Sequence, residues 1–228
     1  MRQSLKAAAL AILIVGCSGD SITSNPYTPP PGQPVVRDPI VFVHGFQSSG
    51  AIWTTMINSF IADGWPASRL NAWSYDSNQS NATIALQLKT VVEGILTSTG
   101  AAKVDIVSHS MGGLSSRYFA KNLGGDSEID AWVSLGGPNH GTTTANLCSL
   151  ESCIEMRPGS AFLLALNADD ETPGTPRYAT WWSACDQVTT PQESVVLTGA
   201  VNTQTACLQH SQLYLDAAVY QQVRDWVK

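Results

Sequence analysis

The sequence of 228 residues has few charges and no long apolar run. Only 13% of the residues are charged, with 12 Lys and Arg against 18 Asp and Glu and a net charge of −6. No cluster of basic residues follows the N-terminus, and phosphate binding needs such clusters, so nucleic acid is not an expected partner. The apolar run of nine residues at 7–15 is too short to cross a bilayer. With 43% hydrophobic residues and no internal repeat, we expect one globular domain.

The first 36 residues are expected to lie outside that domain. A basic segment and the apolar run lead into Ile14-Val15-Gly16-Cys17, which resembles the lipobox of bacterial lipoproteins. In that class the signal peptide, here 1–17, is cut before the cysteine, whose thiol is lipidated. Residues 18–36 contain five prolines and predict an extended tether. We therefore expect export from a bacterial cell and a lipid anchor on Cys17, facing the periplasm or the outside. A plain signal peptide and a secreted product is the alternative.

The cysteine count agrees with a lipidated Cys17. The chain has five cysteines, an odd number. Using one for a lipid leaves four, an even set for an exported protein, and four cysteines allow three pairings. We favour Cys148–Cys153, which closes a short loop, and Cys185–Cys207, which joins two loops late in the chain. The other pairings remain open at this point.

Short apolar runs alternate with stretches of helical spacing in residues 37–228. The apolar runs predict strands at 40–46, 70–76, 103–110, 129–137, 177–186 and 194–202. The stretches between them predict helices at 51–63, 82–98, 111–123 and 211–227. Such alternation is typical of βαβ units, so we expect a mostly parallel sheet of about six strands with helices on both faces. Functional residues of such sheets follow the carboxyl ends of the strands.

The segment "VSHSMGG" at 107–113 places Ser110 between a strand and a helix, on the sharp turn that joins them. Ser108 and Gly112, two positions to either side, are small, as a tight turn requires. A serine exposed on such a turn resembles the nucleophile elbow of α/β-hydrolases, in which the usual first residue is glycine rather than serine. Ser110 is therefore the candidate nucleophile.

A serine hydroxyl needs a base to take its proton, and the chain has four histidines. In α/β-hydrolases the order along the chain is nucleophile, acid and histidine, with the histidine after the last strand. Only His210 fits that place. His44 lies too early, His109 inside the elbow is expected to point away from the active face, and His140 could line the site.

The acid of an α/β-hydrolase precedes the histidine and follows a strand. Asp186 fits this position and would orient His210 and stabilise its protonated form. The acidic residues at 169–171 lie in a polar, turn-like stretch and are expected to belong to a solvated loop. Two backbone N–H groups should stabilise the oxyanion that forms during acyl transfer. The candidates are Met111, directly after the nucleophile, and Phe46 in "HGF" after the first strand.

A set of motifs in one order extends this resemblance over residues 37–228. The chain resembles the small bacterial lipases and esterases of the class 2 lipase type through the motifs "VFVHGF", "VSHSMGGL", "LGGPNHGT", "GSAFLLALN" and "SACDQVTTPQES", followed by His210. The resemblance implies a three-layer α/β-hydrolase fold and ester hydrolysis through an acyl-enzyme, without cofactor or metal. Ser108 departs from the motif. Cys185, directly before the acid, suggests a disulfide that fixes Asp186 relative to the His210 loop.

The substrate class is less defined than the chemistry. The insertion at 138–176 is short, so we expect a small lid or none, and its apolar residues form either an acyl-binding wall or ordinary core. Short- to medium-chain acyl esters or glycerides are the expected substrates of a monomeric enzyme. An acyltransferase with the same triad and a non-catalytic envelope binding protein are the alternatives, and a peptidase is a weaker one, since a fold does not fix a substrate.

Overall fold

The computed structural model describes residues 37–228. The expected signal peptide, the lipidation of Cys17 and the proline-rich tether lie outside the described residues. Within them, six strands form one sheet in the order β2-β1-β3-β4-β5-β6, and every neighbouring pair is parallel. The strands are β1 (Ile40–Val43), β2 (Leu70–Trp73), β3 (Val104–His109), β4 (Ile129–Leu135), β5 (Arg177–Trp182) and β6 (Val201–Gln204). The expected parallel sheet of about six strands is confirmed.

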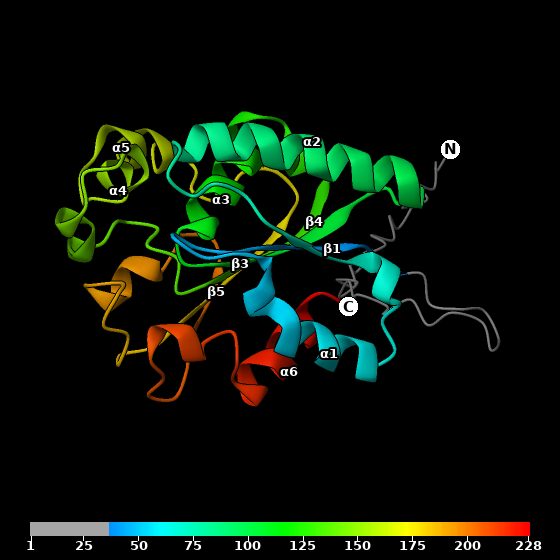
Figure 1. Ribbon diagram of the computed structural model, residues 1–228. Helices are drawn as coiled ribbons and strands as arrows, with labels where there is room; N and C mark the ends of the chain where they lie inside the picture. Colours follow the sequence, from blue (N-terminus) through cyan, green and yellow to red (C-terminus); the bar gives the residue numbers. More distant parts are fainter. Residues whose placement is uncertain (1–36) are drawn as a thin grey trace, which may run out of the picture. The chain divides into compact units, whose positions relative to one another are not determined.

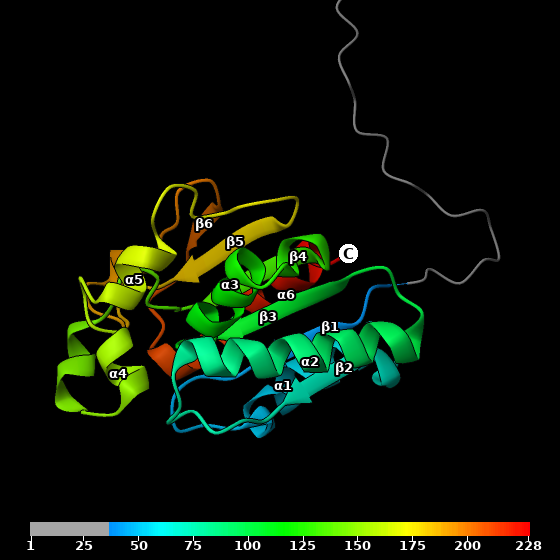
Figure 2. The same cartoon turned by 90° about the horizontal axis from the view of Figure 1, so that it is seen from above.

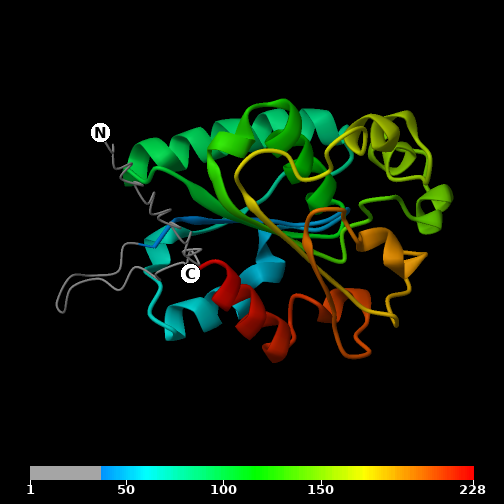
Figure 3. The same ribbon diagram turned by 180° about the vertical axis from the view of Figure 1, so that it is seen from behind.

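Helices cover both faces of this sheet. The α-helices are α1 (Thr54–Ala62), α2 (Asn81–Thr99), α3 (Gly112–Asn122), α4 (Glu151–Glu155), α5 (Ala161–Leu166) and α6 (Ala217–Trp226). Short 3-10 turns lie at Gly50–Trp53, Ala67–Arg69, Gly125–Ser127, Thr143–Leu147, Gln192–Val195 and His210–Gln212. Figures 1 and 3 show α2 and α3 on one face of the sheet and α1 and α6 on the other. This is the three-layer α/β-hydrolase architecture expected from the sequence.

The continuous apolar runs of the strands reflect this double coverage. In β1, Ile40 and Phe42 belong to the core shared with α1 and α6, whereas Val41 and Val43 belong to the core shared with α2 and α3. All four side chains are completely buried. Because successive strand residues point to opposite faces, a strand buried on both faces needs apolar residues at every position.

Two elements begin later along the chain than the sequence pattern predicts. Residues 194–198 form no strand but the end of a 3-10 turn and the bend after it, with Val195 and Leu197 buried, and the sixth strand begins at Val201. Asn202 holds this turn, since its side chain accepts a hydrogen bond from the Leu197 N–H (3.0 Å) and donates one to the Leu197 carbonyl (2.9 Å). The last helix begins at Ala217, where the Asp216 carboxylate accepts hydrogen bonds from the first turn. Local polar side chains therefore override the apolar pattern in both places.

The insertion between β4 and β5 gathers at the carboxyl ends of the strands. Figures 1 and 2 show α4 and α5 together at that end, beyond the edge of α3. On α5, Leu163 and Leu166 are buried against a core that includes Leu114 of α3, while Leu164 is 65% exposed. The stretch 161–166 is thus part core and part surface. Among residues 37–228, no helix is both long enough and apolar enough to span a membrane.

Candidate active site

Ser110 is the first of the two turn residues between the end of β3 at His109 and the start of α3 at Gly112. Its φ angle of 55° lies in the left-handed region, which a residue with a side chain adopts only under constraint. The constraint comes from both sides of the elbow. The Ser110 N–H donates to the Leu135 carbonyl of β4 (2.9 Å), and the Ser110 carbonyl accepts from the Gly113 N–H of α3 (2.9 Å). These bonds hold the hydroxyl-bearing residue at the carboxyl end of the sheet.

The turn around Ser110 tolerates a side chain at position 108 but not at position 112. A Cβ added to Gly112 would lie 2.5 Å from the His44 carbonyl oxygen, which no side chain can tolerate. Position 108, by contrast, accepts a serine because the completely buried Ser108 hydroxyl donates to the Val133 carbonyl of β4 (2.7 Å). The departure from the usual Gly-x-Ser-x-Gly pattern is therefore compensated by a hydrogen bond.

His210 and Asp186 meet beside this elbow. The His210 Nδ1 atom lies 2.7 Å from Asp186 Oδ2, and the Asp186 side chain is only 2% exposed. The second carboxylate oxygen, Oδ1, accepts from the backbone N–H groups of Val188 (2.8 Å) and Thr189 (3.0 Å). The carboxylate is therefore fixed by the backbone and accepts the Nδ1 proton. This leaves the Nε2 atom of a neutral His210 unprotonated.

The Nε2 atom of His210 is buried and has no hydrogen-bond partner among residues 37–228. A buried nitrogen without a partner is unusual in a folded protein and is typical of a functional position. The pair lies against Gly136, directly after Leu135, to which Ser110 is bonded. A Cβ at Gly136 would lie 3.3 Å from both Asp186 Oδ2 and His210 Cε1. All three candidate residues thus border the same turn after β4.

His109 does not point away from the site as expected. Its ring packs against the His210 ring, with centroids 4.5 Å apart, and its Nε2 atom lies 3.1 Å from the His210 carbonyl oxygen. Burial and the neighbouring His210 lower the pKa of His109 well below its ordinary value, so the ring is neutral. Its single N–H is on Nε2 and donates a hydrogen bond to the His210 carbonyl. His109 therefore supports the backbone of the histidine loop.

The two predicted oxyanion donors both lie close to Ser110. Met111 follows it in the chain, at the N-terminus of α3. Phe46 lies with Ser110 at the same pocket. Among residues 37–228, neither the Phe46 N–H nor the Met111 N–H donates to another protein atom. Unpaired backbone donors beside a nucleophile are the groups that an oxyanion requires.

A pocket of about 230 Å³ opens next to Ser110. Its walls are almost entirely apolar and come from the loop after β1, the insertion and the loop after Asp186. The lining residues are Phe46, Ser110, Pro138, Thr142, Thr144, Ala145, Leu147, Cys148, Cys153, Met156, Val188 and Thr189. Leu147, at 89% exposed, lies at its rim. The insertion therefore supplies a wall of the pocket as well as core.

Both favoured disulfides are present. Cys148–Cys153 links the turn before α4 to that helix and lines the pocket, and Cys185–Cys207 links the residue before Asp186 to the loop that precedes His210. The second disulfide therefore links the backbone next to Asp186 to the backbone of the loop that carries His210. Two disulfides fit a protein that is exported to an oxidising compartment.

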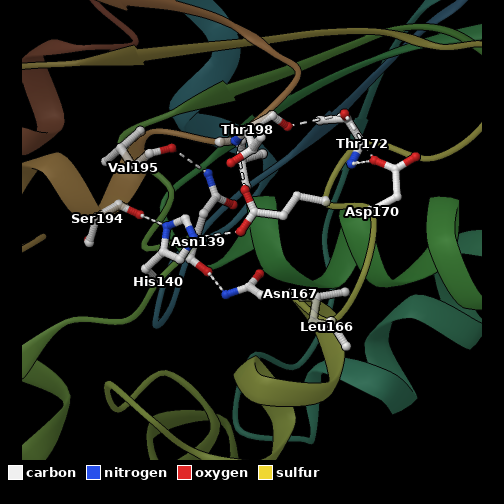
Figure 4. A network of polar contacts seen from close by, with 12 residues as sticks. Asn139, His140, Leu166, Asn167, Asp170, Thr172, Ser194, Val195 and Thr198 are labelled. Carbon is white, nitrogen blue, oxygen red and sulfur yellow. Dashed lines mark hydrogen bonds and ion pairs between the residues drawn. The ribbon is translucent and has the colours of Figure 1, made fainter.

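His140 does not belong to the pocket lining but to a polar network that holds the insertion (Figure 4). Its Nε2 atom lies 2.7 Å from Glu171 Oε1, and the other oxygen of Glu171 accepts from the Thr198 N–H (2.7 Å). Burial alone would raise the pKa of the Glu171 carboxyl, but the hydrogen bonds from Thr198 and His140 outweigh it and lower that pKa. The carboxylate thus joins the two ends of the insertion to each other and to the loop before β6.

Arg117 of α3 continues this network beneath the insertion. The guanidinium is completely buried and donates to the Asn139 carbonyl (3.3 Å) and to Asn167 Oδ1 (2.5 Å). Asn167 in turn donates to the Asn139 carbonyl (2.9 Å). Burial lowers the pKa of Arg117 to about 10. Within residues 37–228, no cluster of three or more His, Cys, Asp or Glu side chains is placed to hold a metal ion.

Comparison with known sequences gives one family. The model of the family described as Lipase (class 2) matches residues 37–226. A triacylglycerol lipase of Burkholderia plantarii is 26% identical over 148 residues, which cover 61% of this chain and 41% of that protein. A triacylglycerol lipase of Pseudarthrobacter phenanthrenivorans is 27% identical over 116 residues, 48% of this chain and 36% of that protein. The chain thus spans about two fifths of the length of these curated relatives.

Solved structures support the fold. The mature form of lipase BlEst2 from Bacillus licheniformis superimposes with a TM-score of 0.73, covering 88% of this chain and 96% of that one, at 16% identity. Lipase B of Aspergillus fumigatus superimposes with a TM-score of 0.69 over 81% of this chain and 51% of that one, at 15% identity.

Proposed function

This chain belongs to the class 2 lipase family, and on that basis we propose that it is a serine carboxylic-ester hydrolase, a lipase or esterase that works through an acyl-enzyme. The observation that carries the proposal is the arrangement at the end of β4. A constrained Ser110 elbow and a carboxylate-bound histidine with a free Nε2 atom border the same turn. Nucleophile, base and orienting acid are the three groups that serine hydrolysis requires.

In this mechanism the Ser110 Oγ atom attacks the ester carbonyl carbon while His210 Nε2 takes the hydroxyl proton. Asp186 keeps its charge and stabilises the imidazolium through the Nδ1–H. The negative charge that develops on the carbonyl oxygen is met by the N–H groups of Met111 and Phe46, each worth about 3 kcal/mol in the transition state. The alcohol leaves with the proton from Nε2, and a water molecule then repeats the sequence on the acyl-enzyme to release the acid.

The pocket beside Ser110 supports short- to medium-chain acyl esters or glycerides as substrates. Its apolar walls have few polar groups to bind anything but a hydrocarbon chain. Each methylene buried there contributes about 0.8 kcal/mol, so kcat/KM should rise roughly fourfold per methylene until the chain outgrows the pocket. Beyond that length the gain should stop, because further carbons remain in solvent.

The experiment is hydrolysis of nitrophenyl esters of increasing acyl length by the detergent-solubilised full chain. Ser110→Ala should abolish turnover, and Ser98→Ala, at an exposed position on α2, should leave it unchanged. No turnover without an added alcohol, together with formation of a new ester when an alcohol is present, would indicate an acyltransferase instead. A folded sample that turns over no ester in either case would refute the proposal and favour a binding role.

For localisation, the proposal is export from the cell and a lipid anchor on Cys17. The two disulfides agree with export, and a lipid anchor on Cys17 stays a prediction from the sequence. Fractionation of cells producing the full chain and a Cys17→Ser variant tests it, since only the parent chain, with its lipidated Cys17, should remain with the membranes.

A further inference from the structure

His44 follows β1 and has no role in the mechanism described above. It is completely buried, and its ring stacks on that of Tyr75 with centroids 4.0 Å apart and an angle of 13° between the planes. Both ring nitrogens are hydrogen-bonded. Nδ1 lies 2.8 Å from the Gly45 carbonyl oxygen, and the Tyr75 backbone N–H lies 3.2 Å from Nε2. A histidine held on both sides in this way has one fixed orientation.

These two partners also determine the tautomer of His44. A backbone N–H can only donate, so Nε2 accepts from Tyr75 and carries no proton. The proton of the neutral ring is therefore on Nδ1, which donates to the Gly45 carbonyl. Burial lowers the pKa of His44, which keeps the ring neutral.

The Gly45 carbonyl belongs to the same peptide unit as the Phe46 N–H. A trans peptide is planar, and its C=O and N–H point in opposite directions. The hydrogen bond from His44 to the C=O at one edge of this plane therefore fixes the direction of the N–H at the opposite edge. The unit lies directly against the nucleophile, because a Cβ added to Gly45 would be 2.7 Å from Ser110 Cβ and 3.3 Å from its Oγ.

The next residue is fixed as well. The Gln47 N–H donates to the Ser77 hydroxyl (2.8 Å), and Gln47 has a φ angle of 49°. The Tyr75 hydroxyl also donates to the His44 carbonyl. The turn that carries Phe46 is thus bound to the loop after β2 on both sides of the Gly45–Phe46 peptide.

We propose that His44 is a positioning residue of the oxyanion hole, which holds the Gly45–Phe46 peptide through its Nδ1–H so that the Phe46 N–H faces the oxyanion formed at Ser110. This rests on the proposed ester hydrolysis. His44 touches no substrate, so its loss should lower kcat and leave KM almost unchanged, since the oxyanion exists only in the transition state.

Two variants separate the two hydrogen bonds of the ring. In His44→Asn the side-chain amide nitrogen takes the place of Nδ1 and still donates to Gly45. In His44→Gln the amide oxygen takes the place of Nε2 and still accepts from Tyr75, but no donor reaches Gly45. We expect kcat to stay within about fivefold of the parent in His44→Asn and to fall about 10²- to 10³-fold in His44→Gln, the loss typical of one oxyanion donor.

A second readout reports the oxyanion directly. A trifluoromethyl ketone adds to the serine hydroxyl and forms a tetrahedral oxyanion, so its affinity should fall with kcat in His44→Gln and recover in His44→Asn. A structural role alone would lower the melting temperature of both variants without this difference. Equal kcat in two folded variants, or a loss in His44→Asn as large as that in His44→Gln, would overturn the proposal.

A measurement on the unmodified chain covers the case in which a variant does not fold. Nitrogen-15 NMR of the imidazole at pH 8 should find the His44 proton on Nδ1, and a proton on Nε2 would overturn the proposal. The proposed function fails separately. If ester hydrolysis by the parent chain does not depend on Ser110, both proposals are wrong, whereas a Ser110-dependent esterase with unaffected His44 variants refutes only the positioning role.

Discussion

Replacing Gly136 by alanine should lower turnover in addition to its cost in stability. Gly136 has a φ of +62°, and a Cβ there would lie 2.8 Å from Leu213 Cδ1 and 3.3 Å from both Asp186 Oδ2 and His210 Cε1. The Leu213 side chain can move away, but the new Cβ still presses on the Asp186 carboxylate and the His210 ring. At 3.3 Å the catalytic pair must move by a few tenths of an ångström. A misplacement of about 1 Å costs about 10²-fold in rate, so we expect kcat to fall about tenfold in Gly136→Ala.

Gly124→Ala is the matched control, because Gly124 has a φ of +83° and an added Cβ would meet nothing within 4 Å. Both variants carry the left-handed backbone cost of about 1–2 kcal/mol. At about 2–4 °C per kcal/mol for a domain of this size, each melting temperature should fall by roughly 2–8 °C. The assay is nitrophenyl ester turnover together with thermal unfolding. Similar kcat values in the two folded variants would refute the assignment of the Asp186–His210 pair.

Three further predictions concern residues around the site and the core. Asp186→Asn should lower kcat by about 10⁴-fold without loss of fold, because an amide stabilises the wrong histidine tautomer; steady-state kinetics and circular dichroism check this. Burial raises the pKa of Asp105 well above its ordinary value of 3.8, so the folded chain holds this proton more tightly than the unfolded chain, and stability is lost as pH rises from about 4 through the raised pKa. Asp105→Asn should therefore melt at a higher temperature than the parent at pH 8, with a difference that shrinks on acidification, and a constant difference across pH would contradict this. Replacing Cys185 and Cys207 together by serine opens a bond with a sequence separation of 22 and should cost about 3 kcal/mol by loop entropy; kcat should fall too, and unfolding in denaturant with unchanged stability would exclude this role.

The nucleophile was predictable from the sequence because its signal is local. A strand, a serine between small residues and a helix lie within one short segment around Ser110, and the sterics of the turn depend only on its neighbours. Asp186 and His210 lie 24 residues apart, and no local pattern joins them. Their pairing was expected only because the order of groups along an α/β-hydrolase chain is fixed.

Other features depend on contacts that a local pattern does not contain. "LGG" at 135–137 is an ordinary turn signal, and nothing in it indicates that Gly136 backs the acid and the histidine. His109 was expected to point away because it neighbours Ser110 in the chain, yet the histidine loop brings His210 against its ring. The stretch 194–202 was predicted as a strand from its β-branched residues, but the side chain of Asn202 closes a turn there. In each case a long-range or side-chain contact decides the structure.

The sequence also could not distinguish core from pocket within the insertion. Met156 and Leu163 both belong to apolar stretches of the same insertion, and both are buried. Both pack in the core that includes Leu114, and Met156 lines the pocket as well. Which of the two also faces the pocket depends on how the insertion folds back beside Ser110, and its apolar pattern does not contain that information.

The central claim is that Ser110 is the nucleophile of a serine ester hydrolase. The most direct test is to treat the full chain with a nitrophenyl phosphonate, which transfers its phosphonyl group to an activated serine and releases nitrophenolate. Peptide mass spectrometry should place the adduct on Ser110, in step with the loss of esterase activity, and Asp186→Asn should slow the labelling. Full inactivation with Ser110 unmodified, or turnover that persists after complete labelling, would contradict the account.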